Sequence, residues 1–388
     1  MKRVFLLVID GLGVGYNNDR QFIEDIGSNT LSHILQETNA YLPTLRKLGF
    51  MHLPTIDMDN GMNVVADYAL ISPLSVGKDS SMGHWEIAGC VIKQNYDRFT
   101  LGFPDEITDI ICKAFGCDQV LLNKSYCDVR AIRDYGDRHF ATGYPIVFTN
   151  TDSCLQIACH GAVYSLEELY YACNYIRENL PAKYKICRII ARPFAGIKDN
   201  YYFTKDRRDW SLDPPKNNLV NALANKNFQT ISVGKVNELF AEQGFSTAYV
   251  SKTNQQCFDS LNEAVKEDWT GLCFANFGDT DILYGHRNDI DGYKECLYGI
   301  DHFLKDFMPK LTADDALIVT ADHGNDPYTA STNHSREFLP FALYSPALSG
   351  GKYLGEFEGL NNISDLVKVL LGVSKKSDIM SKIKEMHK

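Results

Sequence analysis

This chain of 388 residues lacks several features, and each absence excludes a class of protein. None of its 11 cysteines belongs to a CxxC pair, which argues against a zinc ribbon and against a thioredoxin-like redox motif. The longest apolar stretch near its start is VFLLVI, whereas a membrane-spanning helix requires roughly 20 apolar residues. No secretory signal is visible either, so we expect a cytoplasmic protein with free thiols and no membrane partner.

The chain is also short of positive charge. Its net charge of -10 at pH 7 argues against a nucleic-acid partner, because such proteins neutralise phosphates with Lys and Arg. The same charge would repel an anionic substrate unless metal ions or a local basic pocket reversed it. With 45% hydrophobic residues the chain can bury a sizeable core, and its length permits two domains or one domain with an insertion.

Short, wholly apolar runs predict strands that are buried on both faces of a parallel sheet. These runs are VFLLVI (4–9), GLCFANF (271–277), ALIVTA (316–321) and, more weakly, TAYVSK (247–252). Helical patterns lie between them, for example at 293–308. Strands that alternate with helices predict an α/β fold in which helices flank a mostly parallel sheet.

The middle of the chain has a different pattern and suggests a second, smaller α+β domain. It contains a predicted helix at 104–115, and predicted strands at 144–149 and 187–194. Between these strands, Ser165 and Glu168 form a capping box that opens another helix. We therefore expect the domain 99–215 to be inserted into a core made of 1–98 and 216–388.

Acidic residues follow each of the three strongest strands. They are Asp10, the pair Asp279 and Asp281, and Asp322, which is followed by His323. One such Asp is commonly a turn or helix-capping residue, but ligands of open α/β sheets bind beyond the carboxyl ends of the strands. Three strands that end in this way therefore predict a binding site.

The candidate ligands are enough for two metal ions. They are Asp10, Asp281, His286, Asp322, His323 and His334, together with a hydroxyl group. Paired metals are a standard device for phosphoryl transfer, and mixed oxygen and imidazole ligands suit Mn²⁺, Zn²⁺ or Fe²⁺ better than Ca²⁺. We interpret the remaining histidines outside the GHWE stretch as ordinary polar or surface residues: His33, His52, His139, His160, His302 and His387.

Four motifs in order carry a resemblance to a known family. They are VFLLVIDGLGVG, GKDSSMGHWEIAG, DTDILYGHRND and TADHGNDPYTASTNHSRE. Together they resemble the phosphopentomutases, which belong to the alkaline phosphatase superfamily and are related to cofactor-independent phosphoglycerate mutase. The resemblance implies an alkaline-phosphatase-like core that carries an inserted cap domain.

The resemblance also implies a nucleophile and two sets of metal ligands. The phosphorylated residue would be Ser80, where the family commonly has Thr, and from the residues alone Ser81 remains the competing candidate. Met82 and Asn333 also replace more usual family residues. One metal would be held by Asp10, Ser80, Asp322 and His323, and the other by Asp281, His286 and His334. We expect Asp279 to be a turn residue or a residue that contacts the ligands without binding a metal itself.

The positions implied for binding of the sugar phosphate are Asp152, Arg192, Arg207 and Lys235. An Arg side chain can hold a phosphate with two parallel hydrogen bonds, which Lys cannot do. The implied reaction interconverts α-D-ribose 1-phosphate and ribose 5-phosphate, and the deoxyribose pair, through a phosphoserine enzyme. Two divalent ions, most naturally Mn²⁺, and glucose 1,6-bisphosphate as a priming activator complete the expected chemistry, and no obligate protein partner is implied.

Three alternatives stay open on the sequence. A metal-dependent phosphatase or phosphodiesterase would use the same core with an open site or another cap. A phosphoglycerate-mutase-like enzyme would share the type of reaction, although the GHWE stretch and the short cap favour the pentose enzyme. A binding protein without activity would be expected to have lost ligands, and all six are present.

Overall fold

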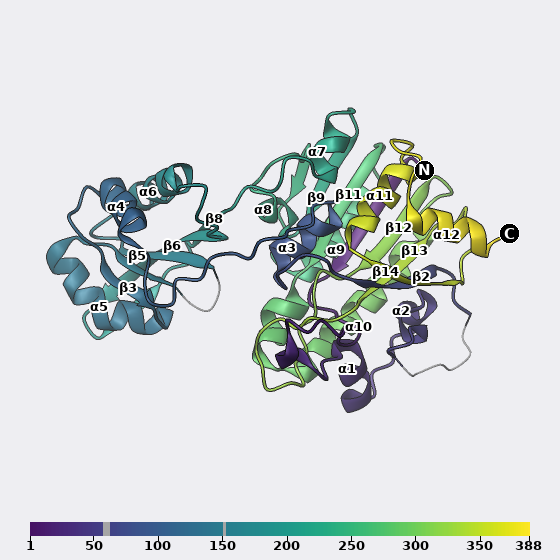
Figure 1. Cartoon of the computed structure of the whole chain (residues 1–388), viewed down its shortest axis with the longest axis horizontal. Helices are drawn as coiled ribbons and strands as arrows, with labels where there is room; N and C mark the ends of the chain where they lie inside the picture. Colours follow the sequence, from purple (N-terminus) through teal and green to yellow (C-terminus); the bar gives the residue numbers. More distant parts are fainter. Residues whose placement is uncertain (57–62, 150–152) are drawn as a thin grey trace. The chain divides into compact units, whose positions relative to one another are not determined.

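The structure, a computed structural model, describes residues 1–56, 63–149 and 153–388. The chain divides into two compact units, Met1–Lys93 with Pro214–Lys388 and Gln94–Asp213. Each unit has its own β-sheet, as Figure 1 shows. No helix in the described ranges is both long and apolar enough to cross a membrane.

The larger unit is built on an eight-stranded sheet. Its strands are Arg3–Ile9 (β1), Asp67–Ser72 (β2), Gln229–Val233 (β9), Thr247–Tyr249 (β10), Gly271–Phe277 (β11), Asp315–Thr320 (β12), Leu339–Tyr344 (β13) and Tyr353–Glu358 (β14). They lie in the order β10-β9-β11-β1-β12-β13-β2-β14. Pairing is parallel except on the two sides of β13, so the sheet is mostly parallel as predicted.

Helices flank this sheet. They are Thr30–Thr38 (α1), Pro43–Lys47 (α2), Ser80–Ile87 (α3), Leu219–Ala224 (α7), Val236–Leu239 (α8), Asn254–Ala264 (α9), Ile290–Phe307 (α10), Asn361–Leu370 (α11) and Asp378–Met386 (α12). Single turns occur at Ile23–Asp25 (η1), Phe50–His52 (η2), Thr280–Tyr284 (η3, a π turn), Gly285–Arg287 (η4) and Met308–Lys310 (η5). The predicted helix 293–308 begins three residues earlier because the Asp289 side chain caps it.

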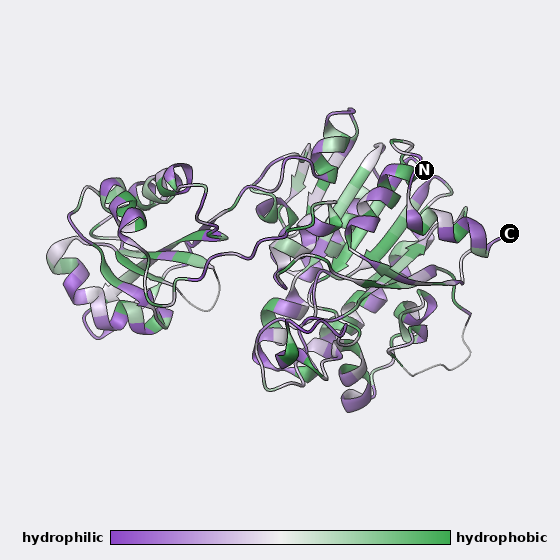
Figure 2. Cartoon of the chain, viewed as in Figure 1, coloured by the Kyte–Doolittle hydropathy of each residue, from purple (hydrophilic) through white to green (hydrophobic). Residues whose placement is uncertain are grey.

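The core of the larger unit lies around its central strands. Every residue of β1, β11 and β12 is buried, which explains their continuous apolar sequences, and these strands are green in Figure 2. Phe258 of α9, Phe277 of β11 and Phe303 of α10 form one aromatic cluster, with ring centroids 4.5–5.7 Å apart. This cluster packs α9 and α10 against the sheet beside the end of β11.

The smaller unit is an α+β sandwich of its own. Its strands are Leu121–Ser125 (β3), Ile146–Thr149 (β4), Cys154–His160 (β5), Arg188–Ile197 (β6), Asn200–Phe203 (β7) and Arg208–Ser211 (β8), and its helices are Asp105–Phe115 (α4), Asp128–Thr142 (α5) and Leu166–Asn179 (α6). The sheet has the order β3-β4-β5-β6-β7, with β8 paired to β6. The predicted capping box of Ser165 and Glu168 opens α6.

Alternation along the strands of the smaller unit separates two cores. In β4, Val147 faces one core with α4 and α6, whereas Ile146 and Phe148 face the other with α5. The two units divide after residues 93 and 213, a few residues before the boundaries expected from the sequence. Both sheets with their flanking helices agree with the fold class that the sequence predicts.

Candidate metal centre and nucleophile

Three parallel strands of the larger unit end at one edge of the sheet. The register pairs Ile9 of β1 with Phe277 of β11, and Val8 of β1 with Thr320 of β12. Side chains that follow these strands therefore come together, since parallel strands in register end at the same edge. Asp10 and Asp322 each lie within two residues of a strand end, and Asp281 lies in the π turn η3 after β11.

The first group of candidate ligands is Asp10, Asp322 and His323, which are all buried and offer ligand atoms within 4.8 Å of one another. The Nε2 atom of His323 lies 3.3 Å from Asp10 Oδ1 and 3.4 Å from Asp322 Oδ2. Asp322 Oδ2 is buried and accepts no well-formed hydrogen bond in the described chain; imidazole nitrogens of His84 and His323 lie 3.2 and 3.4 Å from it. A buried carboxylate oxygen that is satisfied by no hydrogen bond fits a site that a cation occupies.

The second group is Asp281, His286 and His334, whose ligand atoms also lie within 4.8 Å of one another. The Nε2 atoms of His334 and His286 lie 3.3 and 3.5 Å from the Asp281 carboxylate oxygens. The His334 ring stacks on His323 of the first group, with ring centroids 3.8 Å apart. The two groups are therefore neighbours, as a two-metal site requires.

Hydrogen bonds to the backbone show which ring nitrogens are free for a metal. His286 Nδ1 and His334 Nδ1 lie 2.8 and 2.6 Å from the carbonyl oxygens of Thr332 and Lys78. A carbonyl only accepts, so each Nδ1 carries a proton, and the nitrogen left for a metal on each ring is Nε2, which lies toward Asp281. The two Nε2 atoms are 3.2 Å apart. Two imidazole nitrogens and a carboxylate that converge in this way fit a divalent cation.

The electrostatics of the two groups agree with this interpretation. Burial alone would lower the pKa of His323, but Asp322 and Asp10 outweigh it and raise the pKa to about 10. Burial alone would raise the pKa of Asp281, but His334 and His286 outweigh it and hold the pKa well below its usual range. Both carboxylate clusters thus favour a positive charge strongly, whether that charge is a proton or a metal ion.

Ser80 is the first residue of helix α3, and its hydroxyl oxygen points at the first ligand group. Oγ lies 3.0 Å from His323 Nε2 and donates to Asp10 Oδ1 at 3.5 Å. The Asp79 side chain caps the helix by accepting from the backbone N–H groups of Ser81 and Met82, at 3.0 and 3.1 Å. Asp79 is therefore the N-cap residue of α3, and its carboxylate reaches the first free donors of the helix.

Helix α3 lies very close to the backbone that follows β12, and this close approach places Ser80 beside the first group of candidate ligands. A Cβ atom at Gly83 would lie 2.5 Å from the carbonyl oxygen of Asp322, which is too close for any side chain. Glycine therefore allows one turn of the helix to touch the backbone that carries two ligands. The GHWE stretch is thus part of a helix whose residues from Ser81 to Ile87 are buried.

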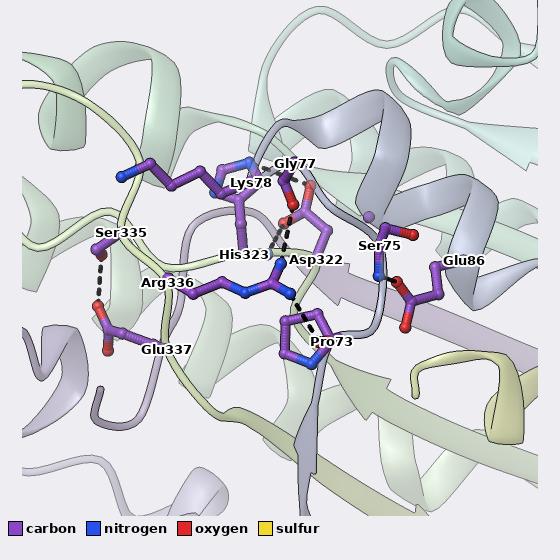
Figure 3. Close-up of a pocket in the computed structure, with 11 residues that line it drawn as sticks. Pro73, Ser75, Gly77, Lys78, Glu86, Asp322, His323, Ser335, Arg336 and Glu337 are labelled. Carbon is purple, nitrogen blue, oxygen red and sulfur yellow. Dashed lines mark hydrogen bonds and ion pairs between the residues drawn. The ribbon is translucent and has the colours of Figure 1, made fainter. Parts of the chain in front are cut away.

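Side chains that the sequence analysis did not single out hold the segment before Ser80. Figure 3 shows the Arg336 guanidinium, which donates to the carbonyl oxygens of Pro73 and Gly77 at 2.8 and 2.9 Å. Buried Glu86 accepts from the backbone N–H groups of Leu74 and Ser75 at 2.8 and 2.6 Å. Arg336 stands two residues after His334, so its place inside the fourth motif was the only sign in the sequence that it lies near the site.

Buried His84 was also missed. Its Nδ1 lies 2.8 Å from the Ser80 carbonyl oxygen and 3.2 Å from Asp322 Oδ2, and its ring stacks on Phe274. The GHWE stretch contains it, but a single buried histidine gives no sign from sequence of the atoms it faces. The structure shows that it contacts both the Ser80 backbone and the first group of candidate ligands.

Of the four positions predicted for substrate binding, Lys235 lies beside Ser80. Its Nζ donates to Ser80 Oγ at 3.0 Å and forms an ion pair with Asp10. Burial alone would lower the pKa of Lys235, but Asp10 and the other two ligand aspartates outweigh it and raise the pKa. Lys235 therefore stays charged and places a cation next to the hydroxyl oxygen.

The other three predicted positions belong to the smaller unit. Arg192 on β6 donates to Asp128 at 2.6 Å and lies over the Phe203 ring, 4.2 Å from its centroid. Arg207 donates to both carboxylate oxygens of Asp209, at 2.8 and 2.7 Å. Asp152 lies outside the described residues. The structure thus brings together Ser80, Lys235 and all six predicted metal ligands, and places the two arginines on the other unit.

Comparison with known proteins identifies the family of this chain. Residues 2–375 match the model of the metalloenzyme superfamily. The phosphopentomutase of Caldanaerobacter subterraneus is 39% identical over 92% of this chain and 90% of its own length. The phosphopentomutase of Dictyoglomus thermophilum is 41% identical over 89% of this chain and 88% of its own. A solved protein from Pyrococcus horikoshii, 15% identical, shares the fold with a TM-score of 0.50 and covers 97% of this chain and 98% of its own.

These matches confirm the family and the fold class that the sequence predicts. The superfamily and the two ligand groups together indicate that the chain binds divalent metal ions. Because curated relatives near 40% identity cover about nine-tenths of it, the chain belongs to the phosphopentomutases of the metalloenzyme superfamily, and it is an isomerase.

Proposed function

We propose that this phosphopentomutase-family enzyme interconverts α-D-ribose 1-phosphate and ribose 5-phosphate, and the deoxyribose pair, with Ser80 as its phosphorylated residue. The observation that carries the proposal is the position of Ser80 Oγ. It lies between His323 Nε2 and Lys235 Nζ, at 3.0 Å from each, and beside the first ligand group. A serine hydroxyl is a weak nucleophile, and this environment of positive charge favours its deprotonated and phosphorylated forms.

The reaction would proceed by two phosphoryl transfers. Phospho-Ser80 would donate its phosphoryl group to the free hydroxyl of the sugar monophosphate, which breaks the Ser80 P–O bond, forms a new sugar P–O bond and returns Ser80 Oγ. The resulting ribose 1,5-bisphosphate would turn around and give its other phosphoryl group back to Ser80. Lys235 would hold the oxygen of Ser80 whenever it is not bonded to phosphorus, because its ammonium already donates to that oxygen.

The divalent ions would be held by the predicted ligand sets. Asp10, Ser80, Asp322 and His323 would form one set, and Asp281, His286 and His334 the other. When bound, the ions would neutralise charge on the phosphoryl oxygens. We propose Mn²⁺ as the natural ion, since oxygen and imidazole ligands suit it, and glucose 1,6-bisphosphate as the compound that first phosphorylates the enzyme.

We further propose that the insertion 99–215 is a cap which supplies Asp152, Arg192 and Arg207 to the sugar phosphate. Two arginines, each held by a carboxylate in this unit, give donors in a fixed direction for a phosphate. Exclusion of water by such a cap would separate a mutase from a phosphatase, because phosphoserine beside two metals would otherwise hydrolyse. None of the cysteines in the described chain forms a disulfide, which suits a cytoplasmic enzyme.

A coupled assay tests the proposal against the alternatives. Ribose 1-phosphate is supplied with Mn²⁺ and a catalytic amount of glucose 1,6-bisphosphate, and ribose 5-phosphate and inorganic phosphate are measured in parallel. We expect ribose 5-phosphate without stoichiometric release of phosphate. Release of phosphate with no isomer would identify a phosphatase, and conversion of phosphoglycerate in preference to pentose phosphate would identify the other mutase.

A further inference from the structure

Two buried asparagines each contact one of the ligand groups. Asn276 on β11 is 1% exposed, and its Nδ2 donates to Asp10 Oδ2 at 2.8 Å. Asn325, directly after His323 and Gly324, is fully buried, and its Nδ2 donates to Asp281 Oδ1 at 2.6 Å. Neither residue is a predicted metal ligand or a predicted substrate contact.

The orientation of both amides follows from chemistry. A carboxylate only accepts hydrogen bonds, so the amide nitrogen rather than the amide oxygen must face it. The opposite atom, Oδ1, is buried in both asparagines and has no hydrogen-bond partner in the described chain. Burial of an unpaired carbonyl oxygen costs free energy, and the hydrogen bond that the same amide donates to a ligand carboxylate offsets part of this cost.

Each asparagine amide donates to one oxygen of a candidate ligand carboxylate. In Asp10, Asn276 and Lys235 both contact Oδ2, which leaves Oδ1 facing His323 Nε2. In Asp281, Asn325 contacts Oδ1 and holds the plane of the group while both oxygens face the histidines. An aspartate with one oxygen held in this way cannot rotate about its last bond, so its remaining lone pairs keep their direction.

The third candidate carboxylate ligand, Asp322, is held by the backbone and not by an asparagine. Asp322 Oδ1 accepts from the backbone N–H groups of His323 and Gly11, at 3.1 and 3.3 Å. No backbone N–H is shown to reach the carboxylate oxygens of Asp10 or Asp281 in the described chain. For Asp10 and Asp281, asparagine side chains thus donate the orienting hydrogen bond that backbone N–H groups donate to Asp322.

Glycines in two motifs make room for Asn325. A Cβ atom at Gly285 would lie 2.5 Å from Asn325 Nδ2, and one at Gly11 would lie 3.1 Å from Asn325 Cβ. The backbone N–H of Asn325 also donates to the Gly11 carbonyl oxygen at 2.8 Å. The first, third and fourth sequence motifs therefore meet around this one side chain.

We propose that Asn276 and Asn325 are positioning residues, one for each metal: Asn276 orients Asp10 and Asn325 orients Asp281. The inference rests on the proposed two-metal function of these carboxylates. It predicts that loss of one amide weakens binding of one metal and leaves the other metal in place. A residue with only a general structural role would affect both metals alike.

Binding of Mn²⁺ alone, measured by calorimetry, tests this in two backgrounds. His323→Ala disables the first ligand group and leaves the second, whereas His286→Ala does the reverse. We expect Asn325→Ala to raise the Kd for Mn²⁺ about ten- to a hundredfold in the His323→Ala background and less than about threefold in the His286→Ala background. Asn276→Ala should show the opposite pattern, so each asparagine variant is the matched control of the other.

Thermal unfolding of the metal-free variants checks that they fold, and Asn325→Ser and Asn276→Ser replace any alanine variant that does not. An unchanged Kd in both backgrounds, or an equal loss in both, would overturn the inference while the two-metal function stands. Absence of Mn²⁺ binding to the unmodified protein would overturn the proposed function, and the inference with it. Asymmetric loss supports both.

Discussion

The imidazole of His334 donates from Nδ1 to the backbone carbonyl oxygen of Lys78, 2.6 Å away, across 256 positions of the chain. Lys78 stands two residues before Ser80, so the segment that carries the proposed nucleophile also orients a candidate ligand of the second group. A displacement of this segment would therefore disturb the hydroxyl and the metal together. The activity and the metal content of variants in this region should change in parallel.

Ser80 rather than Ser81 should carry the phosphate. Protein incubated with glucose 1,6-bisphosphate should gain one phosphate, which mass spectrometry should locate on Ser80, because only its hydroxyl is placed against His323 and Lys235. Ser80→Ala should abolish both labelling and turnover, while Ser81→Ala should keep the label. Ser80→Thr should retain substantial activity, since threonine is the usual family residue. A phosphate found on Ser81 would show that the assignment is wrong.

Metal content should depend on Asp322 and not on Asp279. Asp322 lies in the first ligand group, whereas Asp279 accepts from the backbone N–H of Asn254 and thereby holds the start of α9. Asp322→Ala should lose at least one bound ion and reduce turnover by several orders of magnitude, and chelation should inactivate the unmodified enzyme. Asp279→Ala should keep both ions and lose about 1 kcal/mol of stability. Elemental analysis and thermal unfolding of the two variants give the comparison.

Arg192→Ala should weaken binding of the sugar phosphate. Loss of a charge-assisted hydrogen bond of roughly 1.5–3 kcal/mol would raise KM about ten- to a hundredfold, with metal content unchanged. Arg133 in the same unit is a matched control, because it is exposed and forms an ion pair with its neighbour Asp134. Arg133→Ala should leave KM unaltered. An equal KM for ribose 5-phosphate in both variants would argue against the cap as the substrate-binding unit.

Two glycine-to-alanine substitutions in helices should have opposite effects. At Gly83 the new Cβ would meet the Asp322 carbonyl oxygen at 2.5 Å, so α3 must move away from the ligands. Overpacking of this kind costs about 1–3 kcal/mol, and turnover should fall with stability. At Gly299 in α10 the Cβ would meet only Phe258, at 4.0 Å, and alanine should stabilise by about 0.5–1 kcal/mol. Denaturation midpoints measured together would refute this contrast if both variants moved in the same direction.

The His33–Asp326 pair should make stability depend on pH. The His33 ring donates a 2.6 Å hydrogen bond from Nδ1 to Asp326 Oδ2, which raises the pKa of His33 above its ordinary value. Because the folded-state pKa is the higher one, the stabilisation is complete below the unfolded pKa, about 6.5, and disappears as pH rises through the folded pKa.

His33→Gln in metal-free protein should therefore cost on the order of 1 kcal/mol at pH 6 and clearly less at pH 9. His302→Gln offers a control for the loss of a histidine side chain, because His302 on α10 is exposed. The comparison uses urea unfolding curves of the three proteins at each pH. A cost for His33→Gln that is equal at the two pH values, or larger at pH 9, would contradict this sign.

Local patterns were sufficient to predict most of the elements. The apolar run 271–277 is strand β11, and the capping box of Ser165 and Glu168 opens α6 as expected. Strand character and helix capping depend on residues within about four positions, so they can be inferred from neighbours in the sequence. The acidic residues after three strands likewise predicted a site at one sheet edge, because parallel strands bring their ends together.

What the sequence by itself determined is therefore the order of the elements, the fold class, the family and the residue types of the site. Tertiary structure alone decided which atoms meet. Asn276 contacts Asp10 across 266 positions of the chain. Glycine is required at position 83 because the backbone of Asp322 lies against it. Such contacts depend on how α3, β11 and β12 pack, and no periodicity within one segment records the position of a partner hundreds of residues away. The identity of a ligand can thus be predicted from local sequence, but the side chains that orient it are set by packing.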